Sequence, residues 1–175
     1  MKKLVPMKKV IVENGITILD DHQFSDEVKQ VLSVRASSRK IDYRTLSVKT
    51  LHDVGLCLFY GYRIRKDRYK AFNYLILCVD KAFDDRNKDS AEAAYYVGRM
   101  LDDMEIECAY RHAHLYKYAV ECGHTGGKYH YGLALLDDRN EDYNEEKGLR
   151  LIHEAAEEGC DEAAAFIEKF SNIIN

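Results

Sequence analysis

Histidines and paired carboxylates are the side chains in this 175-residue chain that could carry metal or acid–base chemistry. His112 and His114 are two residues apart on an expected helix, about 200° around its axis, so one face cannot present both to a metal ion. Three carboxylate pairs fall in expected loops and caps, where nothing predicts that they converge or become desolvated: Asp84-Asp85, Asp102-Asp103 and Asp137-Asp138. We expect no catalytic residues, no metal and no cofactor, and predict that the chain is not an enzyme.

A glycine-rich segment from Gly123 to Gly127 (Gly-His-Thr-Gly-Gly) could cradle an anion, because free backbone N–H groups gather at a helix N-terminus. It lacks the Lys-Ser/Thr pair that follows the glycines in a P-loop. We interpret the segment as a turn between two helices.

Cysteine usage and hydropathy predict where the protein resides. Five cysteines, at positions 57, 78, 108, 122 and 160, include no CxxC pair, and one stays unpaired in any disulfide scheme. This favours reduced thiols and an intracellular home. Pro6 and Lys8-Lys9 interrupt any signal-peptide-like start, and no run approaches the ~18 apolar residues that cross a bilayer. We expect a cytoplasmic protein without membrane contact.

Charge is distributed unevenly along the chain. Residues 1–90 hold 18 Lys and Arg against 12 Asp and Glu, a net charge of +6, whereas residues 91–175 hold 8 against 18, a net charge of −10. One interpretation of this polarity is that the charges lie on solvated helix faces. The other is functional: the acidic C-terminal half attracts a basic partner, or unlike halves of two copies associate head to tail. Nucleic-acid binding is disfavoured because no expected helix carries a dense Lys/Arg stripe.

The N-terminal segment carries the one clear β signal. Asn14-Gly15 lies between two short β-branched runs within residues 9–19, and Asn-Gly favours a type I′ hairpin turn. Such a hairpin is marginal alone, so it either docks on the first helices or pairs with another chain as a homo-oligomer contact. Ser25 is an expected N-cap of a short helix, and residues 36–40 form an expected linker. We assign residues 1–45 to this N-terminal unit.

From about residue 46 the apolar period is helical throughout. Three expected helices share one spacing, with a glycine as the third member of an apolar face: Leu51, Val54, Gly55 and Leu58; Ala94, Val97, Gly98 and Leu101; Lys128, Tyr131, Gly132 and Leu135. A glycine inside a helix costs roughly 1 kcal/mol relative to alanine, which is tolerable where a second helix approaches closely. We predict such contacts at Gly55, Gly98 and Gly132, with second helices at about 67–82, 108–122 and 142–158.

This series resembles the Sel1-like repeat, a tetratricopeptide-related α/α unit. The C-terminal copy matches the family pattern at Gly132, Lys147-Gly148, Ala155-Ala156 and Gly159. The first copy matches at Gly55, Gly61, Ile64, Asp67 and Lys70-Ala71. The middle copy matches at Ala91, Ala93, Val97-Gly98 and Ala119 to Gly123, with a loop about two residues shorter.

The resemblance covers about residues 47–170, and residues 161–172 resemble the first helix of a fourth repeat acting as a cap. The first copy lacks the Ala-Ala-x-x-Gly ending, and Lys81–Ser90 is a charged insertion. The resemblance implies a mainly α fold, with a short right-handed α/α solenoid over residues 46–175 after the N-terminal hairpin.

The first helices of α/α solenoids line the concave surface. Asp53, Tyr96 and His130 each stand two residues before a repeat glycine, and Arg99 lies one turn after Tyr96. Tyr and Arg commonly anchor interfaces. We predict that these four residues bind a protein partner, and that the chain is a non-enzymatic interaction module: an adaptor, scaffold or regulator.

Three alternatives use the same fold. The first is a host-targeting effector or viral protein that binds and inhibits a factor. The second is a self-assembling component, driven by the hairpin and the charge polarity. The third is a β-lactam-binding or hydrolysing enzyme, as the Sel1-like resemblance implies for secreted members with regularly paired cysteines; the cysteine spacings here, 21, 30, 14 and 38, do not repeat.

Overall fold

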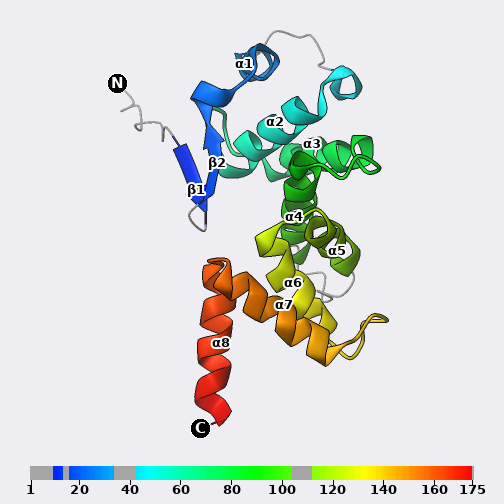
Figure 1. The fold of residues 1–175 in the computed structure, drawn as a ribbon. Helices are drawn as coiled ribbons and strands as arrows, with labels where there is room; N and C mark the ends of the chain where they lie inside the picture. The colour runs from blue at the N-terminus through cyan, green and yellow to red at the C-terminus, as the bar shows by residue number, and fades with distance from the viewer. Residues whose placement is uncertain (1–9, 14–15, 34–41, 104–111, 175) are drawn as a thin grey trace. The chain divides into compact units, whose positions relative to one another are not determined.

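The protein is mainly helical and divides into two compact units, Met1–Lys81 and Ala82–Asn175 (Figure 1). A computed structural model describes residues 10–13, 16–33, 42–103 and 112–174. The Asn14-Gly15 turn, the linker at 36–40 and Cys108 lie outside the described residues. The division falls within the range that the sequence pattern assigns to one solenoid, so a continuous solenoid over residues 46–175 stays a prediction.

Unit 1 contains two strands and three α-helices in its described residues: β1 (Val10–Glu13), β2 (Ile16–Asp20), α1 (Asp26–Ser33), α2 (Val48–Tyr60) and α3 (Arg68–Lys81). Short 3-10 turns stand at Asp21–Gln23 and Tyr43–Thr45. The predicted boundary after residue 45 differs from this grouping, because α1 and β2 both contact α2. These contacts place the hairpin and the first long helix in one unit.

The two strands pair antiparallel, with Ile11 opposite Leu19 and an irregularity between Ile11 and Val12. Leu19 is buried, and β2 contacts α2 within the same chain. The sequence allowed this segment either to dock on the first helices of its own chain or to pair with another chain. The structure shows the first of these arrangements.

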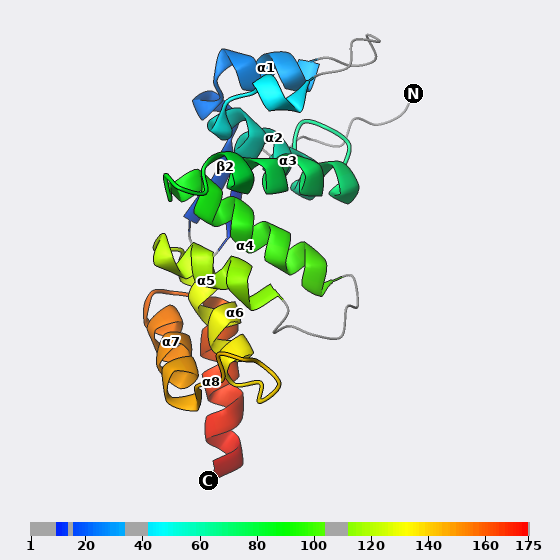
Figure 2. The same ribbon diagram turned by 90° about the vertical axis from the view of Figure 1, so that its right-hand side faces the viewer.

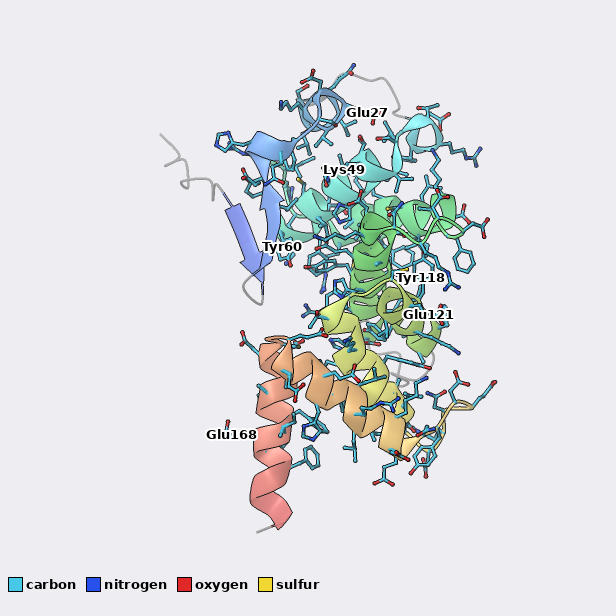
Figure 3. The ribbon with its side chains drawn as sticks, in the orientation of Figure 1. Glu27, Lys49, Tyr60, Tyr118, Glu121 and Glu168 are labelled. Atoms are coloured by element: carbon cyan, nitrogen blue, oxygen red, sulfur yellow. The ribbon has the colours of Figure 1, made fainter. Side chains whose placement is uncertain are left out.

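A carboxylate from α1 ties that helix to the start of α2. Ser47 is the N-cap of α2, and its hydroxyl accepts from the Thr50 amide at 3.2 Å. Glu27, which is labelled in Figure 3, accepts hydrogen bonds from the Ser47 hydroxyl, at 2.6 Å, and from the Thr50 hydroxyl. These two hydrogen bonds hold the pKa of the Glu27 carboxyl below its ordinary value, so α1 is fixed to α2 by a charged acceptor.

Unit 2 is a run of five α-helices in its described residues: α4 (Lys88–Asp102), α5 (Ala113–Glu121), α6 (Thr125–Leu135), α7 (Glu145–Glu157) and α8 (Asp161–Ile174). Each helix contacts the next one in chain order (Figure 2). Gly123 and Gly159 follow the C-cap residues of α5 and α7 and adopt left-handed φ values of 83° and 91°, which ends those helices.

The turn before α6 closes on itself. His124 is the N-cap of α6, and its Nδ1 accepts from the Gly127 amide at 3.1 Å. Gly126 and Gly127 are both buried. Gly123 and His124 of the glycine-rich segment thus form the turn between α5 and α6, as interpreted from the sequence, and Thr125 to Gly127 begin α6.

Each predicted glycine is buried where its helix meets the following helix. An added methyl group would overlap a side chain of that second helix in all three places: Gly55 with Leu75 at 2.6 Å, Gly98 with Tyr116 at 2.8 Å, and Gly132 with Ile152 at 2.7 Å. The paired positions are 20, 18 and 20 residues apart along the chain. The same helix-to-helix contact therefore recurs three times, with the middle copy two residues shorter.

Gly132→Ala is expected to destabilise the protein by about 1–3 kcal/mol, because the new methyl group meets Ile152 and a carbonyl oxygen. That oxygen belongs to Gly148 and lies 2.9 Å away, in backbone that cannot rotate aside. On an exposed helix face the same substitution stabilises by up to ~1 kcal/mol. Urea unfolding followed by circular dichroism measures the change, and a gain in stability would contradict the predicted contact.

Candidate protein-interaction site

Three helices of unit 2 bring one charged side chain each to a common point. Glu162 of α8 lies between Arg99 of α4 and His130 of α6. Its Oε1 is 4.0 Å from Arg99 Nη2, and its Oε2 is 3.6 Å from His130 Nε2. The three side chains are 43%, 28% and 17% exposed in that order, so the group is open to solvent on one side. We call these three residues the charged triplet.

Tyrosine rings hold the two basic members of the charged triplet in place. The Arg99 guanidinium lies 5.6 Å from the centre of the Tyr95 ring, and its Nη1 is 3.4 Å from the Tyr95 hydroxyl. The His130 ring stacks on Tyr116 at 4.9 Å with an interplanar angle of 15°. Stacking of this kind restricts rotation of both side chains, so their orientation is set before any partner arrives.

The stacking platform under His130 is itself anchored. Tyr116 is buried, and its hydroxyl donates to Asp102 Oδ2. Burial, followed by the bond to Asp102 and the charge of that carboxylate, raises the pKa of Tyr116 far above its ordinary value. The phenol therefore stays protonated and keeps donating, which fixes the ring that carries His130.

The charge on Glu162 is stabilised by its neighbours. The pKa of the Glu162 carboxyl lies below its ordinary value of 4.5, and the nearby His130 side chain contributes most to this lowering. Partial burial opposes the shift, and the charge of the Arg99 guanidinium adds to it. Arg99 is charged at every accessible pH, whereas His130 is charged only when protonated. At neutral pH the charged triplet consequently contains an Arg–Glu ion pair with the His130 ring beside it.

Of the four partner-binding residues predicted from the sequence, the structure brings together Arg99 and His130. Tyr96 is 1% exposed and Asp53 is 4% exposed, so the expectation that they project from the packing face is wrong. The physical reason is that α2 and α4 are enclosed on more than one side, since each has ten buried residues. The side opposite the repeat glycine is therefore not the exposed side.

Asp53 lies in unit 1 and accepts hydrogen bonds within its own helix. Its Oδ1 is 2.8 Å from His52 Nδ1 and 3.0 Å from Lys49 Nζ. Burial opposes ionisation, but the bond to His52 and the charges of His52 and Lys49 hold the pKa of Asp53 below its ordinary value. These contacts give the carboxylate a structural role at its position on α2.

The sequence patterns did not predict Tyr95, Tyr116 and Glu162 as site residues. Tyr95 could have been found, because it stands four residues before Arg99 and so shares its helix face. Glu162 carries no such local signal, because its partners are on two other helices. Tyr116 is signalled only by the glycine at position 98, which leaves room for a large ring on the facing helix.

The described residues offer little other candidate chemistry. Within the described residues there is no group of three or more His, Cys, Asp or Glu side chains that could hold a metal ion. The described cysteines, Cys57, Cys78, Cys122 and Cys160, are free thiols, and burial raises the pKa of Cys57 to about 12. No helix in the described part of the chain has both the length and the apolar character needed to span a bilayer.

Comparison of the sequence with protein-family models and with curated proteins gave no match. The resemblance to the Sel1-like repeat therefore rests on the motif residues alone, and membership of that family stays a prediction.

Glu162→Gln is expected to lower the unfolding temperature at neutral pH and to lose this effect in acid. Because the folded-state pKa of Glu162 is depressed, its ion pairs stabilise fully above the unfolded value of 4.5 and are lost as pH falls through the folded value. Thermal unfolding of both proteins across this range measures the difference.

Glu168→Gln is the matched control, because Glu168 is exposed on the same helix and makes no ion pair with any described residue (Figure 3). Equal unfolding temperatures for Glu162→Gln and Glu168→Gln at neutral pH would show that the charged triplet contributes nothing to stability.

Proposed function

We propose that the protein is a non-enzymatic interaction module that binds a peptide or loop of a protein partner. The binding face is the one formed by α4, α6 and α8 of unit 2. The observation that carries this proposal is the charged triplet. Arg99 and His130 are partly exposed, come from different helices and are oriented in advance by tyrosine rings. Pre-oriented Arg and aromatic groups lose little conformational entropy on binding, which is why they serve as interface anchors.

The recurring helix contact supports a repeat architecture of the Sel1-like type. Three glycines meet a side chain 18 or 20 residues later, and the helices of unit 2 each contact their neighbour in sequence. Packing between sequence neighbours is the defining property of a solenoid. In such an array α4, α6 and α8 are the first helices of successive repeats, and the charged triplet lies across all three.

The charge arrangement indicates what a partner must offer. Glu162 is the most exposed member of the triplet, and Arg99 already neutralises part of its charge. A partner with a basic group contacts Glu162, and one with a carboxylate competes with Glu162 for Arg99. Either contact exchanges one ion pair for another, so shape and hydrogen bonding at the tyrosines contribute more to affinity than net charge does.

Arg99→Glu is expected to abolish this binding, because it places two carboxylates opposite each other at the centre of the site. Selection from a random peptide display library supplies ligands without knowledge of the natural partner. Peptides selected on the wild type are expected to bind Arg99→Glu at least ~100-fold more weakly, the loss typical of an interface anchor.

Arg150→Glu is the matched control and makes the same charge reversal. Arg150 is exposed on α7, which is not one of the three helices that carry the charged triplet. Circular dichroism verifies that both variants are folded. Undiminished binding of the selected peptides by Arg99→Glu would refute the assignment of this face.

A further inference from the structure

A cleft in unit 1 is lined almost entirely by one loop. Leu58 and the seven consecutive residues 64–70 enclose about 530 Å³ at the junction of α2 and α3. The loop is fixed by backbone hydrogen bonds, from the Tyr62 amide to Cys57 at 2.8 Å and from the Asp67 amide to Leu58 at 3.0 Å. The volume of the cleft lies within the roughly 300–1,000 Å³ of ordinary ligand pockets. We call it the basic cleft.

The basic cleft carries an uncompensated positive charge. Four cations line it, and the single carboxylate among its lining residues, Asp67, is already engaged by the Lys70 amide at 3.0 Å and the Lys70 ammonium at 3.2 Å. Arg65 and Lys66 are exposed and form no ion pair with any described residue. A ligand with several carboxylates would therefore meet two cations, Arg65 and Lys66, that no described carboxylate pairs with.

Apolar surface lies beside these cations. Leu58 and Ile64 line the basic cleft, and the Tyr69 ring next to them is 79% exposed. A phosphate ion or a fully charged polymer would make no use of such surface. A peptide that alternates carboxylates with an aromatic side chain would use both the cations and the apolar lining.

The chain itself contains a segment with that chemistry. Residues 137–146 comprise the connection from α6 to α7 and the first two residues of α7, and hold six carboxylates against one Arg. Tyr143 in their midst is 48% exposed. Asp138 and Glu141 are exposed and unpaired among the described residues, whereas Asp137 is held by Arg139 at 2.7 Å. We call residues 137–146 the acidic segment.

We propose that the basic cleft of one copy binds the acidic segment of a second copy, with Tyr143 against the apolar lining and Asp138 and Glu141 on Arg65 and Lys66. Opposite charges on separate parts of one chain make this a head-to-tail contact. Such a contact leaves one cleft and one segment free at the ends, so it propagates into longer assemblies unless it closes into a ring.

Two variants separate the halves of this contact. Arg65→Glu/Lys66→Glu disables the basic cleft and leaves the acidic segment intact, and Asp138→Lys/Glu141→Lys does the reverse. Both pairs are exposed loop residues, so the fold is preserved. Lys29→Glu/Arg44→Glu makes the same change of net charge at exposed positions of unit 1 outside the basic cleft and serves as control.

Analytical ultracentrifugation of the full chain tests the proposal. The wild type and the control are expected to grow in sedimentation coefficient with concentration at ~50 mM salt and to return to monomers at ~500 mM, where screening is strong. Each variant alone is expected to associate at least ~10-fold more weakly. An equimolar mixture of the two variants is expected to form a heterodimer, because each supplies the half that the other lacks.

A wild type that stays monomeric at every concentration in low salt would overturn the proposal. So would association that survives in the cleft variant, or a variant mixture that forms no heterodimer. Binding of an oligonucleotide or an unrelated acidic peptide by a strictly monomeric wild type would assign the basic cleft to a different partner. None of these outcomes bears on the charged triplet, which shares no residue with this contact.

Discussion

The close approach of paired helices at three buried glycines is the constraint on which the rest of the structure depends. Without a side chain at Gly98, the Tyr116 ring lies directly against the backbone of α4. That position lets the phenol reach Asp102 and presents a flat face on which His130 stacks. The contact that brings α4 and α5 together therefore also positions the histidine of the charged triplet, so packing and site geometry have one cause.

Charge is used in two different ways in this chain. At the charged triplet, opposite charges meet within one unit and are oriented by aromatic rings, which gives specificity of geometry. At the basic cleft and the acidic segment, charges of one sign are gathered, and Arg65, Lys66, Asp138 and Glu141 form no ion pair with any described residue. Compensated, oriented charges favour selective recognition, whereas uncompensated ones favour attraction that responds to salt. The two surfaces thus differ in the partners that they suit.

Helix positions could be predicted from the sequence because local signals determine them. Glycines at 123 and 159 supply the left-handed residues that end α5 and α7, and the apolar period places the glycines at 55, 98 and 132 on packing faces. Exposure could not be predicted in the same way. Asp53 and Tyr96 are buried because neighbours enclose their helices on several sides, and Glu162 joins Arg99 and His130 only through the packing of three helices.

A double-mutant cycle at the first glycine contact tests the recurring helix pairing most directly. In the wild type, a methyl group at Gly55 lies 2.6 Å from two carbon atoms of Leu75, so Gly55→Ala must destabilise. Leu75→Ala removes both atoms, and in that background Gly55→Ala should become neutral or stabilising, by up to ~1 kcal/mol from helix propensity. We therefore expect the effect of Gly55→Ala on the free energy of unfolding to change sign between the two backgrounds. Equal effects of Gly55→Ala in both backgrounds would contradict it.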